Sequence, residues 1–400
     1  MQGVDSRYAW WRLAASVALS TLGTVGLWGV VVVFPSVQGD FHATRAEVSF
    51  AYTTTMLGFG AGSILLGRLI DTRGAFATML LSAVAVTAGH VLAGLAPSLW
   101  LFTLAQGALI GFGSGAAFIP LVADTSHWFA KRRGLAMAIC ASGNYIGGAL
   151  WPKVIDALGR HYDWRTTYFV IAVVCFAAMV PLCFVLRPRL PAVKGAATAP
   201  APHSTRALGL SPNALQIWLA VAGVGCCVAM AMPQVHIVAY CVDLGYGTAR
   251  GSDLLSIMTA CGIVSRIASG WIADRIGGIK TLLLSSTLQA IALLGYLVSD
   301  SLVSLYLVSA LFGLFQGGII PSYGVIVREY FPPKEAGARM GIAISATIVG
   351  MALGGWMGGK MFDVTGSYHA AFINGILWNA LNGAVVWWLL MRQNRRLVYA

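Results

Sequence analysis

Apolar stretches of 18 or more residues recur from one end of this chain to the other. Each is long enough to cross the hydrocarbon core of a bilayer, about 30 Å thick, as an α-helix. The chain is 58% hydrophobic and only 10% charged, whereas about a quarter of a soluble protein is charged. So few polar residues cannot cover a water-exposed surface. In lipid the backbone must satisfy its own hydrogen bonds, which a helix does. The sequence therefore predicts an all-α membrane protein.

The apolar stretches predict twelve transmembrane helices. We place them at 12–36, 49–70, 75–96, 99–123, 134–158, 164–186, 213–241, 252–274, 279–298, 302–327, 337–361 and 368–391. The first follows Arg7 and Arg12, as the apolar part of a signal peptide would. No small-residue cleavage site clearly follows it, and eleven more spans do, so we treat it as the first transmembrane helix.

The net charge of +12 is usually a sign of binding to nucleic acid or acidic lipid. The distribution of the cations favours another explanation. If both termini are cytoplasmic, 19 of the 26 Lys and Arg residues lie in inner loops and tails, while six lie outside and Arg266 lies within a span. This is the positive-inside pattern. It predicts a multi-pass protein of the cell membrane (the inner membrane if bacterial), with both termini cytoplasmic and no nucleic-acid partner.

One long polar segment, 187–212, is rich in Pro and Ala and predicts a flexible cytoplasmic linker. It would separate an N-terminal six-helix bundle, 1–186, from a C-terminal bundle, 213–392, with a cytoplasmic tail at 393–400.

Internal repetition supports two related halves. GRLIDTRGAFATML starts at Gly67 and GWIADRIGGIKTLL at Gly270, while GLAMAI starts at Gly134 and GARMGIAI at Gly337. Both pairs are 203 residues apart. In this repetition the chain resembles the major facilitator superfamily. The resemblance implies two pseudo-symmetric six-helix bundles that rock about a substrate site near the bilayer midplane.

The G-x-x-x-D-R-x-G pattern at 270–277 resembles that superfamily's loop signature, and the copy at 67–74 is looser. A carboxylate at a helix end can accept hydrogen bonds from a neighbouring helix N-terminus and complement its dipole. We expect Asp71 and Asp274 to form a latch between helices on the cytoplasmic side, unless they are simply solvated loop charges. The expected gating residues also include Arg73, Arg275 and Arg133.

Four shorter patterns resemble the monocarboxylate transporter family. They are DFHATRAEVS (40–49), HWFAKRRGLAMAICASG (127–143), DWR (163–165) and GKMFDVTGSY (359–368). The second is the most specific, because an aromatic pair, a basic run and a small-residue helix start are that family's signature. The resemblance implies transport of small organic acids, often with a proton.

Two positions depart from that family. Trp28 occupies a position in the first helix where members often carry a lysine. Gly262, one turn before Arg266, occupies a position where many carry an acidic or amide residue. We expect Trp28 to line a pocket for a bulkier or aromatic acid.

Arg266 is the sharpest single signal. It lies eight residues before Asp274, about 12 Å along a helix, and therefore near the bilayer centre. A charge there costs at least about 2.5–3.5 kcal/mol, so it needs an aqueous cavity and a partner. A guanidinium can bind a carboxylate through two parallel hydrogen bonds. We predict that Arg266 anchors the substrate carboxylate; the alternative is a structural ion pair with another helix.

Further candidates are polar residues on helices that line the cavity in this superfamily: Gln234, His236 and Tyr323, with Asn374 from the last helix. Each could instead connect helices within a bundle. Histidine is the side chain type that titrates nearest neutral pH, so His236 is a candidate proton carrier, or else a hydrogen-bonded structural residue. Asp124 is expected to form an ion pair at the end of its helix, close to the basic run 131–133.

The sequence contains no Walker A motif, no His-Glu-x-x-His and no nucleophile elbow, and its cysteines lack metal-ligand spacing. We therefore expect no enzyme activity, cofactor or metal, and we expect the glycine clusters to serve close helix packing. The prediction is a secondary transporter of a small organic anion, specifically a monocarboxylate, that works by alternating access. The alternatives are an exporter of metabolites or drugs of the same superfamily and, more remotely, a non-transporting membrane receptor.

Overall fold

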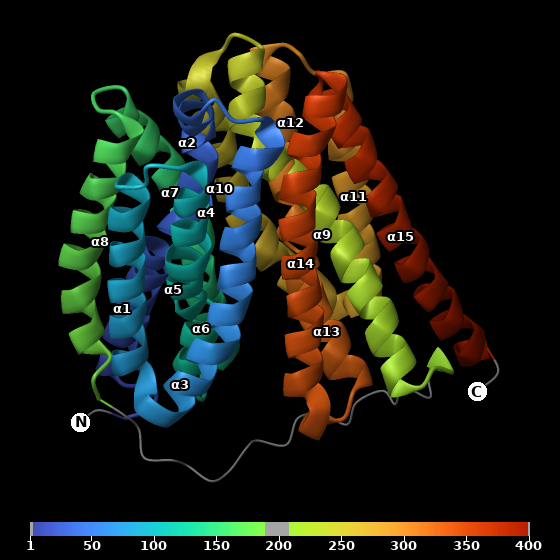
Figure 1. Ribbon diagram of the computed structural model, residues 1–400. Coiled ribbons are helices and arrows are strands. Elements are labelled where there is room, and N and C mark those ends of the chain that lie inside the picture. The colour runs from blue at the N-terminus through green and yellow to red at the C-terminus, as the bar shows by residue number, and fades with distance from the viewer. Residues whose placement is uncertain (1–2, 189–207, 399–400) are drawn as a thin grey trace. The chain divides into compact units, whose positions relative to one another are not determined.

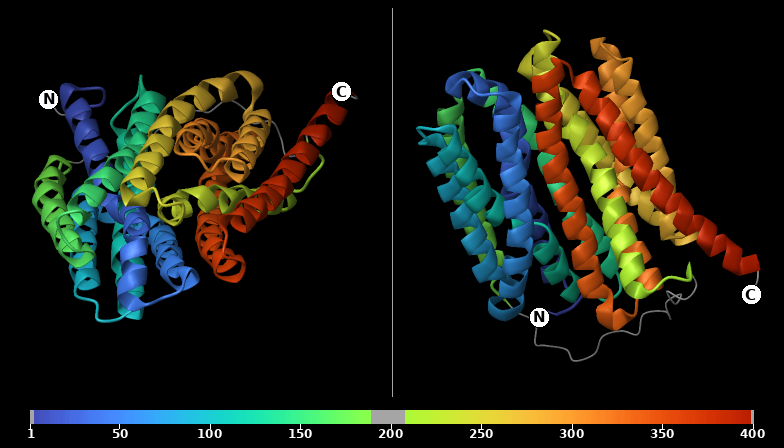
Figure 2. Two further views of the ribbon diagram at one scale, coloured as in Figure 1. Left: turned by 90° about the horizontal axis from the view of Figure 1, so that it is seen from above. Right: turned by 45° about the vertical axis from the view of Figure 1, so that its right-hand side comes forward.

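The structure is a computed structural model that describes residues 3–188 and 208–398, and the regular structure of these residues is helical. Figures 1 and 2 show helices that run side by side through each part of the molecule. Within these described residues, ten helical stretches are long and apolar enough to cross a membrane. The linker predicted at 187–212 lies mostly outside the described residues, as does the end of the tail predicted at 393–400.

Before the linker, the helices are α1 (Arg7–Gly23), α2 (Val25–Phe41), α3 (Arg45–Gly94), α4 (Leu99–Ala105), the π-helix η1 (Gln106–Gly111), α5 (Phe112–Ala116), α6 (Ile119–His127), α7 (Arg133–Gly159) and α8 (Trp164–Val185). After it come α9 (Pro212–Asp243), α10 (Gly247–Ile276), α11 (Gly278–Leu297), α12 (Leu302–Gln316), α13 (Ile319–Tyr330), α14 (Pro333–Thr365) and α15 (Tyr368–Val398).

All twelve predicted spans fall on these helices. The long α3 contains two spans because its backbone leaves helical geometry at Gly74. The predicted span 134–158 coincides with α7. This helix is not among the ten apolar stretches, because its glycines and Asn144 lower its mean hydropathy. Three spans are interrupted: the first at Thr24, the fourth by η1 and the break before α6, and the tenth between α12 and α13.

The chain divides into two compact units. Unit 1 contains the described residues of 1–194 and also Ile237–Thr259, the end of α9 and the first part of α10. Unit 2 contains the described residues of 195–236 and those from Ala260 onward.

Glycines let the helices of unit 1 approach closely. The α3 helix packs against α4, η1, α5 and α8, while α1 and α2 pack against α7. A Cβ on Gly58 would lie 1.9 Å from the carbonyl oxygen of Gly107, and one on Gly115 would lie 2.4 Å from the amide of Ser63. Larger residues do not fit there, so these glycines serve helix packing as predicted.

A buried polar network joins the helices of unit 2, where α11 packs against α12, α13 and α15. The Asn379 amide donates to the Ser286 carbonyl at 2.8 Å, and Gln289 of α11 donates to the Cys226 carbonyl of α9 at 3.1 Å. Helices in an apolar setting gain from such hydrogen bonds.

The repeated motif has the same backbone geometry in both copies. Gly74 has φ of 81° and Gly277 has φ of 82°, a conformation that other residues rarely adopt. In each copy a threonine four residues later donates to the glycine carbonyl, Thr78 at 3.0 Å and Thr281 at 2.8 Å. Each glycine thus ends one helix and lets the next begin immediately.

We expect Gly277→Ala to lower the unfolding temperature of the detergent-solubilised protein. Alanine at this φ should cost about 1–3 kcal/mol. The matched control is Gly270→Ala in α10, where a Cβ would meet nothing within 4 Å; it should be neutral or stabilise by up to about 1 kcal/mol. Equal shifts in both variants would show that the backbone at Gly277 is not the cause.

Candidate functional site

Arg266 lies in α10, ten residues before the helix ends at Ile276, and its side chain is half-buried. At this level α10 packs against the break between α12 and α13. A Cβ on Gly317 would lie 2.5 Å from the Gly262 carbonyl, and one on Gly318 would lie 2.4 Å from the Cβ of Ser269. Small residues on both sides therefore bring a broken helix against the segment that carries Arg266. Broken helices of this kind form substrate sites in several transporter folds.

Gln234 reaches the same break. Its amide nitrogen donates to Oε1 of Gln316, the last residue of α12, at 2.8 Å, and both side chains are buried. The Nε2 of Gln316 is buried and has no hydrogen-bond partner among the described residues. Gln234 of α9 is therefore hydrogen-bonded to the end of α12, and the Nε2 of Gln316 can still donate to another group.

Tyr323 and Asn374 lie elsewhere in unit 2. The Tyr323 hydroxyl lies 3.4 Å from Sγ of Cys226 and 3.5 Å from Oδ1 of Asn382, and the side chain is fully buried. It connects α13 with α9 and α15 inside the unit. Asn374 of α15 is half-buried, and its Nδ2 has no partner in the described part of the chain.

His236 lies in a tight contact between α9 and α14. Its Nε2 donates to the Gly355 carbonyl at 2.8 Å, and its ring centroid lies 5.2 Å from that of Tyr368. A Cβ on Gly358 would lie only 2.4 Å from Nε2, so α14 needs a glycine here. These are packing contacts; a role in proton transfer stays a prediction.

Trp28 packs in unit 1 between α2 and α7. Its indole nitrogen donates to the backbone oxygen and the side-chain oxygen of Asn144, at 3.1 and 3.2 Å. The ring lies on Gly148, where a Cβ would come within 2.8 Å of Cε2. Only 9% of Trp28 is exposed.

The expected gating residues lie at helix ends. Asp71 and Arg73 are exposed in α3, and so are Asp274 and Arg275 in α10. The Arg275 guanidinium stacks 3.5 Å from the ring centroid of Trp271. No ion pair is found for Asp71 or Asp274 within the described ranges, and the latch stays a prediction.

Arg133, the remaining expected gating residue, donates to the Ser126 hydroxyl at 3.2 Å. This contact connects the first turn of α7 with the end of α6.

Glu329 of α13 was not among the residues predicted from the sequence to act at a helix end. Its two carboxylate oxygens accept from the Gly278 amide, each at 3.1 Å, at the start of α11. An acid at a helix N-terminus complements the helix dipole, the part that we expected Asp274 to play. The available signal was that Glu329 is the only acidic residue between 302 and 331.

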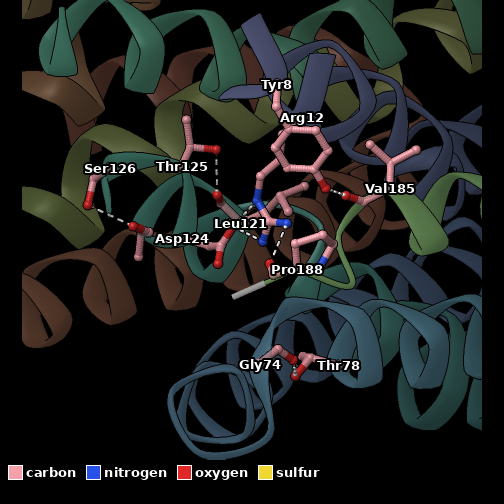
Figure 3. A network of polar contacts seen from close by, with 11 residues as sticks. Tyr8, Arg12, Gly74, Thr78, Leu121, Asp124, Thr125, Ser126, Val185 and Pro188 are labelled. Atoms are coloured by element: carbon pink, nitrogen blue, oxygen red, sulfur yellow. Dashed lines mark hydrogen bonds and ion pairs between the residues drawn. The ribbon is translucent and has the colours of Figure 1, made fainter. Parts of the chain in front are cut away.

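Arg12 forms the centre of a second polar cluster, in unit 1 (Figure 3). Its Nη2 lies 2.8 Å from Oδ2 of Asp124, and its Nη1 donates to the Pro188 carbonyl at 3.2 Å. The guanidinium lies 4.5 Å from the Trp128 ring centroid, and Arg12 is 3% exposed. The ion pair expected for Asp124 exists, but its partner comes from α1 and not from the basic run. Only folding brings these two distant residues together.

The aromatic pair of the 127–143 pattern supports this cluster. The Tyr8 ring lies 5.4 Å from that of Trp128, and the Trp10 ring 5.0 Å from that of Phe129. Tyr8 also donates to the Val185 carbonyl at the end of α8. The pair therefore anchors the start of α1 against the loop before α7.

A sequence profile described as Major Facilitator Superfamily matches residues 16–307 and 252–398, which together span nearly the whole chain. The chain belongs to the Major Facilitator Superfamily. It is thus a multi-pass membrane transporter that binds small molecules, and not an enzyme.

Known proteins of this superfamily resemble the chain along most of its length. Monocarboxylate transporter 13 of Bos taurus is 26% identical over 371 residues, covering 92% of this chain and 86% of that protein. MFS-type transporter pytF of Aspergillus terreus is 27% identical over 277 residues, covering 68% and 92%. The crystal structure of a mutant of the nucleoside transporter NupG superposes with a TM-score of 0.70 at 14% identity, covering 95% and 99%. The resemblance to the monocarboxylate transporter family is therefore confirmed, and the structural match supports the fold.

We expect Arg12→Ala to destabilise the protein by about 3–5 kcal/mol, because Asp124 would lose its buried partner. The double variant Arg12→Met with Asp124→Leu should lose clearly less, since neither charge is stranded. Unfolding temperatures of Arg12→Met, Asp124→Leu and the double variant form a double-mutant cycle that isolates the pair. Additive losses would mean that Arg12 stabilises the fold through its other contacts.

Proposed function

We propose that this transporter carries a small organic anion, specifically a monocarboxylate, by alternating access, and that Arg266 anchors the carboxylate. The observation that carries the proposal is the place of Arg266 well inside α10, several turns from either end of the helix. About 15 Å of helix separates it from Ile276 and about 28 Å from Gly247. A cation at that depth is costly unless it serves a polar cavity or a partner.

The surroundings of Arg266 support this role. The broken helix beside it contributes Gln316, whose buried Nε2 lacks a partner among the described residues. A carboxylate leaving water needs a fixed positive partner and hydrogen-bond donors. Arg266 in α10 and an amide donor at the end of α12, where the chain packs against α10, make a suitable pair of groups.

The resemblance to monocarboxylate transporter 13 supports the substrate class, and Trp28 favours larger acids within it. An indole offers a large apolar face that can stack on an aromatic ring. His236 is the candidate for carrying a proton with the acid; its Nε2 already donates to the Gly355 carbonyl, so Nδ1 would take up that proton.

We expect Arg266→Ala to abolish uptake of radiolabelled acids into proteoliposomes while the protein remains folded. Arg266→Lys keeps the charge but loses the two-pronged geometry. Binding should weaken by about tenfold, which is about 1.4 kcal/mol, and uptake should fall by about tenfold or more. Lys280→Ala removes an exposed charge from the same half and should transport normally.

Thermal stabilisation by the same acids separates substrate binding from folding. Wild-type protein should gain melting temperature from the transported acid, and folded Arg266→Ala protein should not. A folded Arg266→Ala protein that keeps the wild-type gain would refute the anchor. An unfolded or poorly inserted variant would instead support the structural ion pair.

We further propose that the protein lies in the cell membrane with its termini and its 187–212 segment in the cytoplasm. The distribution of lysines and arginines supports this orientation. Protease added to sealed vesicles should cut the segment only from the inner side, with detergent-permeabilised vesicles as the control. Cleavage from the outer side would reverse the topology.

A further inference from the structure

Unit 1 contains a cavity of about 430 Å³ whose walls come from α2, α7, α8 and the start of α10. Val32 and Pro35 line it from α2, Ile155 and Asp156 from α7, and Thr248 from α10. The proposed anchor and its neighbours do not line this cavity, so it has no part in the mechanism described above.

Asp156 is the unusual residue of this cavity, because its side chain is only 5% exposed. Its Oδ2 accepts from Nε and Nη2 of Arg160, at 3.0 and 2.5 Å. Its Oδ1 accepts from the Thr248 hydroxyl at 2.8 Å. Arg160 lies one turn further along α7, whereas Thr248 lies in the first turn of α10. One buried carboxylate therefore fastens the start of α10 to α7.

Two ion pairs also connect the 237–259 part of unit 1 with its other helices. Lys153 of α7 lies 3.3 Å from Asp253 of α10, and Arg45 of α3 lies 2.6 Å from Asp243 at the end of α9. The Lys153 side chain is 56% exposed, and an exposed ion pair contributes little. A buried hydrogen bond to a charged group contributes more, so the Asp156–Thr248 contact holds α10 to α7 more strongly than the Lys153–Asp253 pair does.

A tightly packed layer lies along the helices below the cavity. Trp28 lies one turn before Val32 on α2, and Gly148 lies two turns before Ile155 on α7. A Cβ on Gly148 would lie 2.8 Å from both Cε2 of Trp28 and Cγ2 of Thr259 in α10. Thr259 is fully buried. Three of the helices that line the cavity, α2, α7 and α10, thus pack tightly together at this level.

We propose that the cavity is an entrance vestibule of the transport path and that the Asp156–Thr248 hydrogen bond latches the layer of Trp28, Gly148 and Thr259 shut beneath it. Opening this layer requires the first part of α10 to leave α7, and the hydrogen bond opposes that separation. The proposal rests on the alternating-access mechanism proposed above, and it does not depend on Arg266 or on the identity of the acid.

The test measures how often Thr259 becomes accessible. Thr259→Cys is introduced into the full chain in lipid nanodiscs, and its reaction with a water-soluble maleimide is followed without substrate. The same protein without this cysteine gives the background from the native cysteines. Thr248→Val keeps the shape but removes the hydroxyl, and Asp156→Asn removes the charge. Each should raise the labelling rate of Cys at position 259 several-fold.

The matched control is Asp163→Asn, which lines the same cavity. Asp163 accepts from the Thr166 amide at 3.2 Å as the N-cap of α8, and asparagine preserves such a cap. In Thr259→Cys protein that also contains Asp163→Asn, the labelling rate of Cys at position 259 should equal that of Thr259→Cys protein alone. An equal rise in this control, or no rise in Thr248→Val protein with wild-type melting temperature, overturns the latch.

Two outcomes distinguish the latch from effects on folding and from the identity of the substrate. If Asp156→Asn lowers the melting temperature, Thr248→Val decides the question, because it leaves the Asp156–Arg160 pair intact. If none of the radiolabelled acids is transported but labelling rises as expected, the substrate assignment fails and the latch stands.

Discussion

Polar groups in this protein must find partners inside the chain, because the lipid around it offers none. The backbone meets this constraint by forming helices almost everywhere in the described residues. Side chains meet it in small closed sets: Arg12 with Asp124 and the Pro188 carbonyl, Asp156 with Arg160 and Thr248, and Gln289 with the Cys226 carbonyl. Each set joins elements far apart in the sequence and so fixes how helices pack.

Glycine makes these sets possible, since a hydrogen bond between helices needs close axes. His236 reaches the Gly355 carbonyl only because Gly358 leaves room for its ring. Trp28 lies flat on α7 only because position 148 carries no side chain. At Gly317 and Gly318 the same device brings α10 against a broken helix. Residues that looked like packing glycines in the sequence thus set the geometry around the proposed functional residues.

The proposed anchor and the proposed vestibule latch follow one physical rule in two forms. A charge in an apolar setting is expensive unless it is paired or serves a ligand. Asp156 is paired with Arg160 and Thr248, and this makes it suited to holding helices together. Arg266 lies well inside α10, on a stretch that packs against the break between α12 and α13, and this makes it suited to receiving a carboxylate.

The sequence by itself determined the fold class, the positions of the spans and the duplicated glycine motif. Their signals can be read from the sequence alone: the length of an apolar run, and a pattern that recurs 203 residues later. The structure adds that the last glycine of each copy, Gly74 and Gly277, has the same backbone conformation. The sequence also correctly placed Asp124 in an ion pair, but it could not name Arg12, 112 residues away.

Only the tertiary structure decided which polar residues meet. Glu329 of α13 accepts from the Gly278 amide at the start of α11, 51 residues away in the sequence, and no local pattern predicts this contact. Trp28 donates to Asn144, and Tyr323 faces Cys226 inside its unit. Such pairings depend on helix rotation and spacing, which small residues on distant segments set together. Apolar periodicity fixes where each helix runs, but partner choice is a property of the packed set of helices.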